Sequence, residues 1–253
     1  MKTNKIMRVA SVLLVAVLLT TCAISGTFAK YVTTGNTGDG ARVAKWGIVM
    51  DSTGTATFKD TYDATVATSG TTGDAVVAPG TNNSATYTIT GAPETAYTVS
   101  FAYNNQTLEE VYLGAGTYTY ADAQGAVTYV GMDQTVTSNY YPIKYTVTVS
   151  TTNGTLNDGS AFTANTAKNY DTLAAALTDL AATTIAFDPN EACDVTVTIA
   201  WAWAIQNADQ NANAYDTILG DLAAGNADLT KSEGAAYNLT VLYDLTVTVT
   251  QKD

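Results

Sequence analysis

The sequence predicts an all-β protein, a jelly-roll-like sandwich of two antiparallel sheets with one or two short helices in its connections. Three observations support this prediction. Apolar residues alternate with threonines in several segments, clusters of Gly, Asn, Asp and Pro separate those segments, and helical spacing is confined to two short stretches. Because so little helix cannot cover roughly nine strands that each have one apolar face, two sheets packed face to face are expected.

The clearest strand lies near the C-terminus. Residues 239–250 place Leu239, Val241 and Tyr243 on one face and mostly threonines on the other. Strict alternation over this length indicates one buried and one solvent-exposed face. The same pattern predicts strands at residues 96–103, 142–150 and 194–203, and weaker ones at 41–50, 55–59, 84–90, 117–120 and 126–130.

Two segments depart from this alternation. Residues 171–180 place Leu173, Leu177 and Leu180 at helical spacing after an acid, Asp171, which predicts a short amphipathic helix between two strands. A second helical turn is expected at residues 215–222.

The N-terminal residues 1–29 have the pattern of a secretory signal peptide. Three basic residues precede an apolar run at 12–19, and small residues at Thr27 and Ala29 predict cleavage after Ala29. The apolar run is short for a retained membrane anchor, and lipidation at Cys22 is a minor alternative. The predicted organisation is a leader (1–29), a flexible N-terminal segment (30–40) and a single β-sandwich domain (41–253).

Composition excludes several classes of function. The net charge is −12, and removal of the leader lowers it to −15, which disfavours nucleic-acid binding. The chain has no histidine, and Cys193 is its only cysteine beyond the leader. Triads that contain histidine, histidine or thiolate zinc sites and an intrachain disulfide are therefore ruled out, and we predict that the protein is not an enzyme and needs no cofactor.

One acidic segment has the oxygen spacing of a calcium loop. Asp209, Asn211 and Asn213 follow a D-x-N-x-N pattern, which makes them candidate calcium ligands. The continuation departs from that pattern, because Ala214 stands where a glycine is expected and Gly220 where an acid is expected. Polar turn residues without an ion are the alternative.

Several motifs at the two ends of the chain resemble the TasA/camelysin group of exported proteins of Gram-positive bacteria, whose leaders are cut by a SipW-type signal peptidase. The resemblance covers both ends and leaves residues 106–186 unmatched. Camelysin-type members have been regarded as metalloproteases, but the zinc motif that this needs is missing here. The matching motifs are Gly26-Thr27-Phe28-Ala29 with Lys30-Tyr31, the segment 41–48, Ala78-Pro79-Gly80, Trp201-Ala202-Trp203, the segment 215–220 and Val249-Thr250-Gln251.

The resemblance implies a secreted jelly-roll subunit of an extracellular biofilm-matrix fibre. In such fibres the N-terminal segment of one copy adds a strand to the next, so the residues expected to mediate self-assembly are Lys30, Tyr31, Val32, Thr33 and Thr34. Within its own chain this segment is expected to stay disordered, and an ordinary linker is the alternative. The implied partners are further copies, the signal peptidase during export, and matrix or cell-wall components.

A second class of function uses exposed aromatic rings. A monomeric surface adhesin or carbohydrate-binding module could use tyrosines outside the apolar strand faces, with or without calcium. The candidates are Tyr118, Tyr120, Tyr140 and Tyr141.

Overall fold

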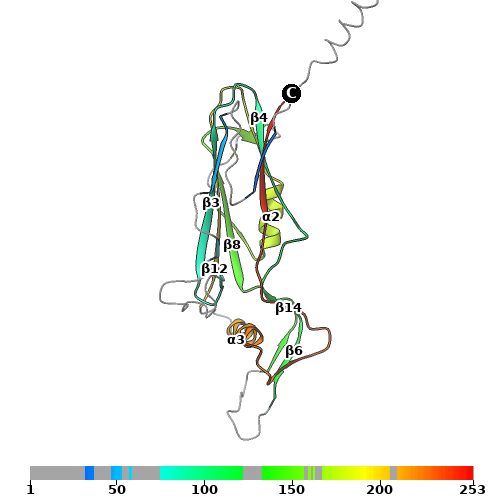
Figure 1. Ribbon diagram of the computed structural model, residues 1–253. Coiled ribbons are helices and arrows are strands. Elements are labelled where there is room, and N and C mark those ends of the chain that lie inside the picture. Colours follow the sequence, from blue (N-terminus) through cyan, green and yellow to red (C-terminus); the bar gives the residue numbers. More distant parts are fainter. Residues whose placement is uncertain are drawn as a thin grey trace, which may run out of the picture.

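The chain folds into a two-sheet antiparallel sandwich, elongated along its strands, and the part that the structure describes includes two helices (Figure 1). The computed structural model describes residues 32–36, 47–52, 57–58, 75–121, 133–156, 159–160, 162, 167–205 and 210–252. The predicted all-β sandwich is therefore confirmed. Among the described residues, no helix is long and apolar enough to cross a membrane.

The first sheet contains five strands in the order β1-β15-β4-β11-β9, with every neighbouring pair antiparallel. Its border strands are the short β1 and β9. The bounds are β1 (Val32–Asn36), β15 (Leu245–Gln251), β4 (Tyr97–Tyr103), β11 (Thr184–Phe187) and β9 (Thr155–Leu156).

The second sheet also contains five antiparallel strands, in the order β10-β8-β12-β3-β2. Its centre is the long strand β12, which pairs with β8 on one side and with β3 on the other. The bounds are β10 (Lys168–Tyr170), β8 (Ile143–Ser150), β12 (Cys193–Trp203), β3 (Asn82–Gly91) and β2 (Val49–Ser52).

The core lies between the sheets and follows the alternation in the sequence. Along β12, Val195, Val197 and Ile199 are fully buried, whereas the threonines between them are only half-buried. In the first sheet, Tyr97 stacks on Phe187 with the ring centroids 4.8 Å apart. Period-two alternation places one face of each strand in this shared core, which is why the strand predictions succeed.

Helix α2 (Leu173–Ala181) packs against β4 of one sheet and β8 and β10 of the other. Its buried face consists of Leu173, Ala176, Leu177 and Leu180. Two side chains accept hydrogen bonds from its first turn: Thr172 from the Ala175 N–H at 3.2 Å, and Glu110 from the Leu173 and Ala174 N–H groups. The helix predicted at residues 171–180 is thus confirmed, and its unpaired N-terminal donors are satisfied by local and distant acceptors.

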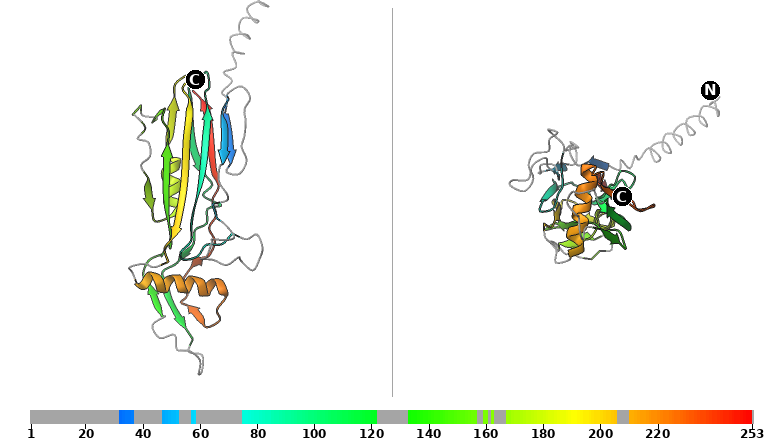
Figure 2. Two further views of the ribbon diagram at one scale, coloured as in Figure 1. Left: turned by 90° about the vertical axis from the view of Figure 1, so that its left-hand side faces the viewer. Right: turned by 90° about the horizontal axis from the view of Figure 1, so that it is seen from below.

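A small terminal module lies at the end of the sandwich away from the C-terminus (Figures 1 and 2). Helix α3 (Gln210–Ala224) runs across this end and buries Ala212, Ile218 and Leu219. The predicted turn at 215–222 is therefore part of a longer helix. The strands of the module are β6 (Gly116–Tyr120), β7 (Gln134–Val136) and β13 (Leu229–Lys231) in one sheet, and β5 (Tyr112–Leu113) and β14 (Tyr237–Asn238) in another.

The long strands match their predictions at 84–90, 96–103, 142–150 and 194–203, and β6 matches the one at 117–120. The strand predicted from residue 239 is wrong at its start, because β15 begins at Leu245. The Asn238 side chain there accepts hydrogen bonds from the Thr240 N–H and hydroxyl, and Leu242 forms only an isolated bridge to Glu109. The segments 41–46, 55–56 and 126–130 and residue 59 lie outside the described residues. The strand predicted at 55–59 is wrong at residues 57–58, which form a bend.

Candidate functional site at the β15 edge

Strand β1 covers the outer edge of β15, at the border of the first sheet. The register pairs Val32 with Thr250, Thr34 with Thr248 and Asn36 with Thr246 in an antiparallel ladder. The expectation that residues 30–40 have no partner in their own chain is therefore wrong for Val32–Asn36. An unpaired sheet edge is a row of free backbone donors and acceptors, and the chain's own N-terminal segment satisfies that row.

The β1 sequence offers little apolar surface to this pairing. Thr33 and Gly35 stand opposite Val249 and Val247, which belong to the buried core of the sandwich. Val32 is the only aliphatic residue larger than alanine in the segment VTTGN. Backbone hydrogen bonding therefore dominates the β1–β15 contact, and β1 contributes much less to stability than a strand with an apolar face.

Strand β2, the next along the chain, is held far more firmly. Ile48 is fully buried and Met50 is 8% exposed, so this segment contributes to the core. Gly91 packs so closely that a Cβ there would lie 2.4 Å from the Gly47 carbonyl oxygen. Figure 2 shows β1 and β2 at the same border of the sandwich, one on each sheet.

A second anchor follows β2 at Thr57 and Phe58. The Thr57 carbonyl accepts hydrogen bonds from the Trp201 indole N–H at 2.8 Å and from the Asn83 amide at 3.0 Å. The Phe58 ring lies 5.3 Å from the Trp201 ring, centroid to centroid, and 6.5 Å from that of Tyr243. The described segments that follow β1 are thus anchored by side chains as well as by backbone pairing.

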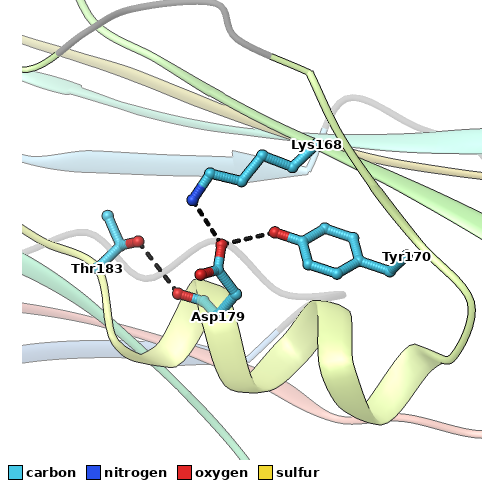
Figure 3. Close-up of polar contacts among 4 residues, drawn as sticks. All are labelled: Lys168, Tyr170, Asp179 and Thr183. Carbon is cyan, nitrogen blue, oxygen red and sulfur yellow. Dashed lines mark hydrogen bonds and ion pairs between the residues drawn. The ribbon is translucent and has the colours of Figure 1, made fainter.

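The opposite border of the second sheet is closed by side chains of the same chain (Figure 3). Asp179 on α2 accepts hydrogen bonds from the Lys168 ammonium at 2.8 Å and the Tyr170 hydroxyl at 2.6 Å, which ties the helix to β10. These two bonds lower the pKa of Asp179. The Thr183 hydroxyl donates to the Asp179 backbone carbonyl at 3.2 Å. The two borders therefore differ, since this one includes a helix and a polar network.

Only some of the residues predicted to mediate self-assembly lie in the described part of the chain. Val32, Thr33 and Thr34 lie in β1, whereas Lys30, Tyr31 and the cleavage residue Ala29 lie outside the described residues. The structure brings the three described residues together with Thr248, Val249 and Thr250 of β15, which the sequence did not single out for this role.

The two described candidates for calcium ligation lie in a helix and not in a loop. Asn211 and Asn213 lie in the first turn of α3, where residues two apart point in different directions, and Asp209 lies outside the described residues. A calcium loop needs several oxygens converging on one point, which a helical turn at this spacing does not provide. Within the described part of the chain, no three acidic or cysteine residues cluster in a way that could hold a metal.

The tyrosines proposed as surface contacts are mostly engaged. Tyr118 is fully buried and donates to the Gly114 carbonyl at 2.9 Å. Tyr120 and Tyr140 donate to acids of α3, and Tyr141 lies 5.9 Å from the Tyr112 ring, centroid to centroid. Tyr118 is therefore not a surface contact, whereas the other three rings are half-buried.

Asp216 of α3 is a buried carboxyl at the junction between the sandwich and the terminal module, and its burial was not predicted from the sequence. It is 8% exposed, and the Tyr140 hydroxyl donates to it at 2.8 Å. Burial raises the pKa of Asp216 to about 6, against the opposing effects of Tyr140 and of the nearby Trp203 indole. The Trp203 N–H is buried and meets the geometry of a hydrogen bond with none of the described groups.

Compared with protein-family models, with curated proteins and with solved structures, the chain matches none. Its function is therefore inferred from the geometry of the β15 edge and from its sequence.

Proposed function

We propose that the protein is a secreted structural subunit of an extracellular-matrix or cell-surface fibre, and that copies assemble by exchanging the N-terminal strand β1. The observation behind this proposal is the β15 edge. A short strand occupies it through backbone pairing, while the following segment is anchored in the core at Ile48 and Met50. The leader, the acidic charge and the resemblance to TasA-type proteins support export to the surface of a Gram-positive bacterium.

Exchange of β1 keeps the contacts of the single chain. The same backbone pairs with Thr246, Thr248 and Thr250 form whether β1 comes from the same copy or from a neighbour. Residues 37–47 connect β1 to the anchored Ile48, and eleven extended residues reach up to about 35 Å. A neighbour's β15 therefore lies within reach, and rising protein concentration favours the exchanged form.

Successive exchange produces an open chain of copies. Each copy has one β1 strand that can be donated and one β15 edge that can accept a strand. Because the donated strand and the accepting edge are different surfaces, the contact is head-to-tail. A head-to-tail contact that does not close into a ring extends as a filament. Such a polymer needs neither a catalytic group nor a metal.

Deletion of residues 30–40 is expected to leave a folded monomer that forms no filaments. Most of the core lies outside the deleted segment, so the thermal unfolding midpoint should fall by only a few degrees, consistent with a loss of about 1 kcal/mol. Electron microscopy of mature wild-type and deleted chains over a range of concentrations measures the effect. Filaments of the deleted chain with normal morphology would contradict strand exchange.

A synthetic peptide of residues 30–40 supplies the matched control. Added in excess to the wild-type chain, it should occupy the β15 edge and shorten the filaments. The same peptide with Val32 and Thr34 replaced by proline cannot donate at those positions and should have little effect. Equal shortening by both peptides would indicate a non-specific action.

A further inference from the structure

The outer face of the second sheet presents a grid of small neutral side chains, here called the threonine grid. It spans β8, β12 and β3, whose register places Thr198 opposite both Thr148 and Thr86. Most members are half-buried, and the Thr86 and Thr198 hydroxyls lie 3.2 Å apart. The grid consists of Thr146, Ala200 and Ser84, then Thr148, Thr198 and Thr86, then Ser150, Thr196 and Thr88.

The threonine grid lacks charge although the protein is strongly acidic. The five longest described strands carry just two charged residues, Lys144 in β8 and Asp194 in β12. These two stand beyond opposite ends of the grid, because Lys144 pairs with Ala202 and Asp194 with Thr90. A third charge, the exposed Asp51 of the neighbouring strand β2, stands beside Thr88 at the lateral border of the grid. Surfaces elsewhere on two acidic copies repel one another, and the grid allows close approach without that repulsion.

From these features we propose that the threonine grid of one copy packs face to face on the grid of a second copy, with the strands antiparallel. In this orientation Lys144 of one copy lies near Asp194 of the other, which gives one pair of opposite charges at each end of the contact. Asp194 also accepts hydrogen bonds from Thr151 and Thr152 of its own chain. Lys144 is 3.1 Å from Asp171, but both side chains are more than half exposed. Such an exposed pair is weak and leaves Lys144 available to a second carboxylate.

The size of the grid makes a single contact weak. Three strands about 4.8 Å apart and five residues of about 3.3 Å each cover roughly 240 Å², well short of the ~800 Å² per partner of a stable dimer. Many contacts in parallel are needed, and a fibre provides them because its copies are linked. The inference therefore rests on the proposed fibre for its biological setting, and it predicts that fibres associate side by side into bundles.

Thr198→Lys tests the contact at the centre of the grid. A lysine there faces its own counterpart across the interface and should reduce bundling by roughly tenfold or more, while single fibres keep their normal length. Thr119→Lys is the matched control, because Thr119 and Thr230 form a similar cross-strand hydroxyl pair, at 2.8 Å, in the terminal module. It adds the same charge outside the grid and should leave bundling unchanged.

Beads densely coated with the mature chain through a C-terminal tag provide an arm that needs no fibres, when an excess of the residue 30–40 peptide is present to block strand exchange between beads. Wild-type and Thr119→Lys beads should clump, and Thr198→Lys beads should stay dispersed with an unchanged circular dichroism spectrum of the free variant. Equal clumping of all three, or clumping only after cell-wall polysaccharide is added, would overturn the copy-to-copy contact. Fibre loss with normal bead clumping would count against the proposed fibre and not against the grid.

Discussion

Asp216→Asn is expected to raise the free energy of unfolding by about 2 kcal/mol above pH 7, and to have little effect near pH 4. The wild-type carboxyl has a pKa of about 6 when folded, because it is buried beside Tyr140 and Trp203, and about 3.9 when unfolded. Ionisation of a buried carboxyl opposes folding. The asparagine amide removes that cost and still accepts the Tyr140 hydrogen bond.

The sign follows from proton binding. Between pH 4 and 6 the folded state holds the Asp216 proton more tightly than the unfolded state, so the stability that it contributes is complete below pH 4 and declines as pH rises through 6. A shift of about two pKa units corresponds to about 3 kcal/mol. The variant should realise less than this, because the amide N–H₂ group would place a second donor beside the buried Trp203 indole N–H, where the wild type has a carboxylate oxygen.

Urea unfolding of the two proteins at pH 4, 6 and 8 measures the difference directly. Asp221→Asn is the matched control, since Asp221 lies on the same helix and accepts the Tyr120 hydroxyl at 2.6 Å, but is less buried. Its effect should be within about 1 kcal/mol and on the destabilising side. A pH-independent effect of Asp216→Asn would contradict the assignment of a raised pKa to this carboxyl.

Gly91→Ala is expected to destabilise the protein by about 3 kcal/mol and to loosen β2 from the second sheet. The new Cβ would lie 2.4 Å from the Gly47 carbonyl oxygen and 2.9 Å from the Ile48 Cα, so backbone must move. The backbone φ of +150° at Gly91 adds strain for any residue with a side chain. Overpacking and strain each cost about 1–3 kcal/mol.

Gly234→Ala separates the two causes. Gly234 has a φ of +83°, but a Cβ there meets no atom within 4 Å, so only the strain of about 1 kcal/mol is expected. Thermal unfolding compares the two variants, and limited proteolysis reports whether the chain before β3 is released in Gly91→Ala. Equal destabilisation by both substitutions would show that the close packing on Gly47 and Ile48 is unimportant.

The central part of the fold was predictable because its signal is local. Along β3, β4, β8 and β12, successive side chains point alternately to the core and to the outer face of the sheet. The apolar residues therefore recur at every second position, and this pattern is visible in the sequence. Helix α2 was predictable for the same reason, through the spacing of Leu173, Leu177 and Leu180. Residues 239–244 alternate in the same way but do not belong to a continuous strand. Alternation of apolar residues indicates which side chains are buried, and it does not show whether a neighbouring strand is present to pair with.

The features that escaped prediction depend on distant partners. Strands of two to four residues, such as β9 and β11, are too short for periodicity to appear. Nothing in VTTGN indicates that it pairs with β15 more than two hundred residues away. Asp216 becomes unusual only because Tyr140 and Trp203 meet it at the end of the sandwich, and Asn211 looked like a ligand only while α3 was read as a loop.

Strand exchange is tested most directly by a disulfide between β1 and β15. Thr34 and Thr248 are register partners, so Thr34→Cys with Thr248→Cys allows one bridge across the contact. Cys193 is buried, and burial raises the pKa of its thiol to about 11, which keeps it out of thiol exchange. Thr34→Cys alone is the control for bridges formed outside the register.

When the double variant is oxidised as a dilute monomer, β1 should be locked to its own β15 and filaments should fail to form until the bridge is reduced. When it is oxidised after assembly, a non-reducing gel should show a ladder of covalent multimers, because each bridge then joins two copies. Filaments that yield only internally bridged monomers, or that assemble from the locked monomer, would contradict the exchange of β1.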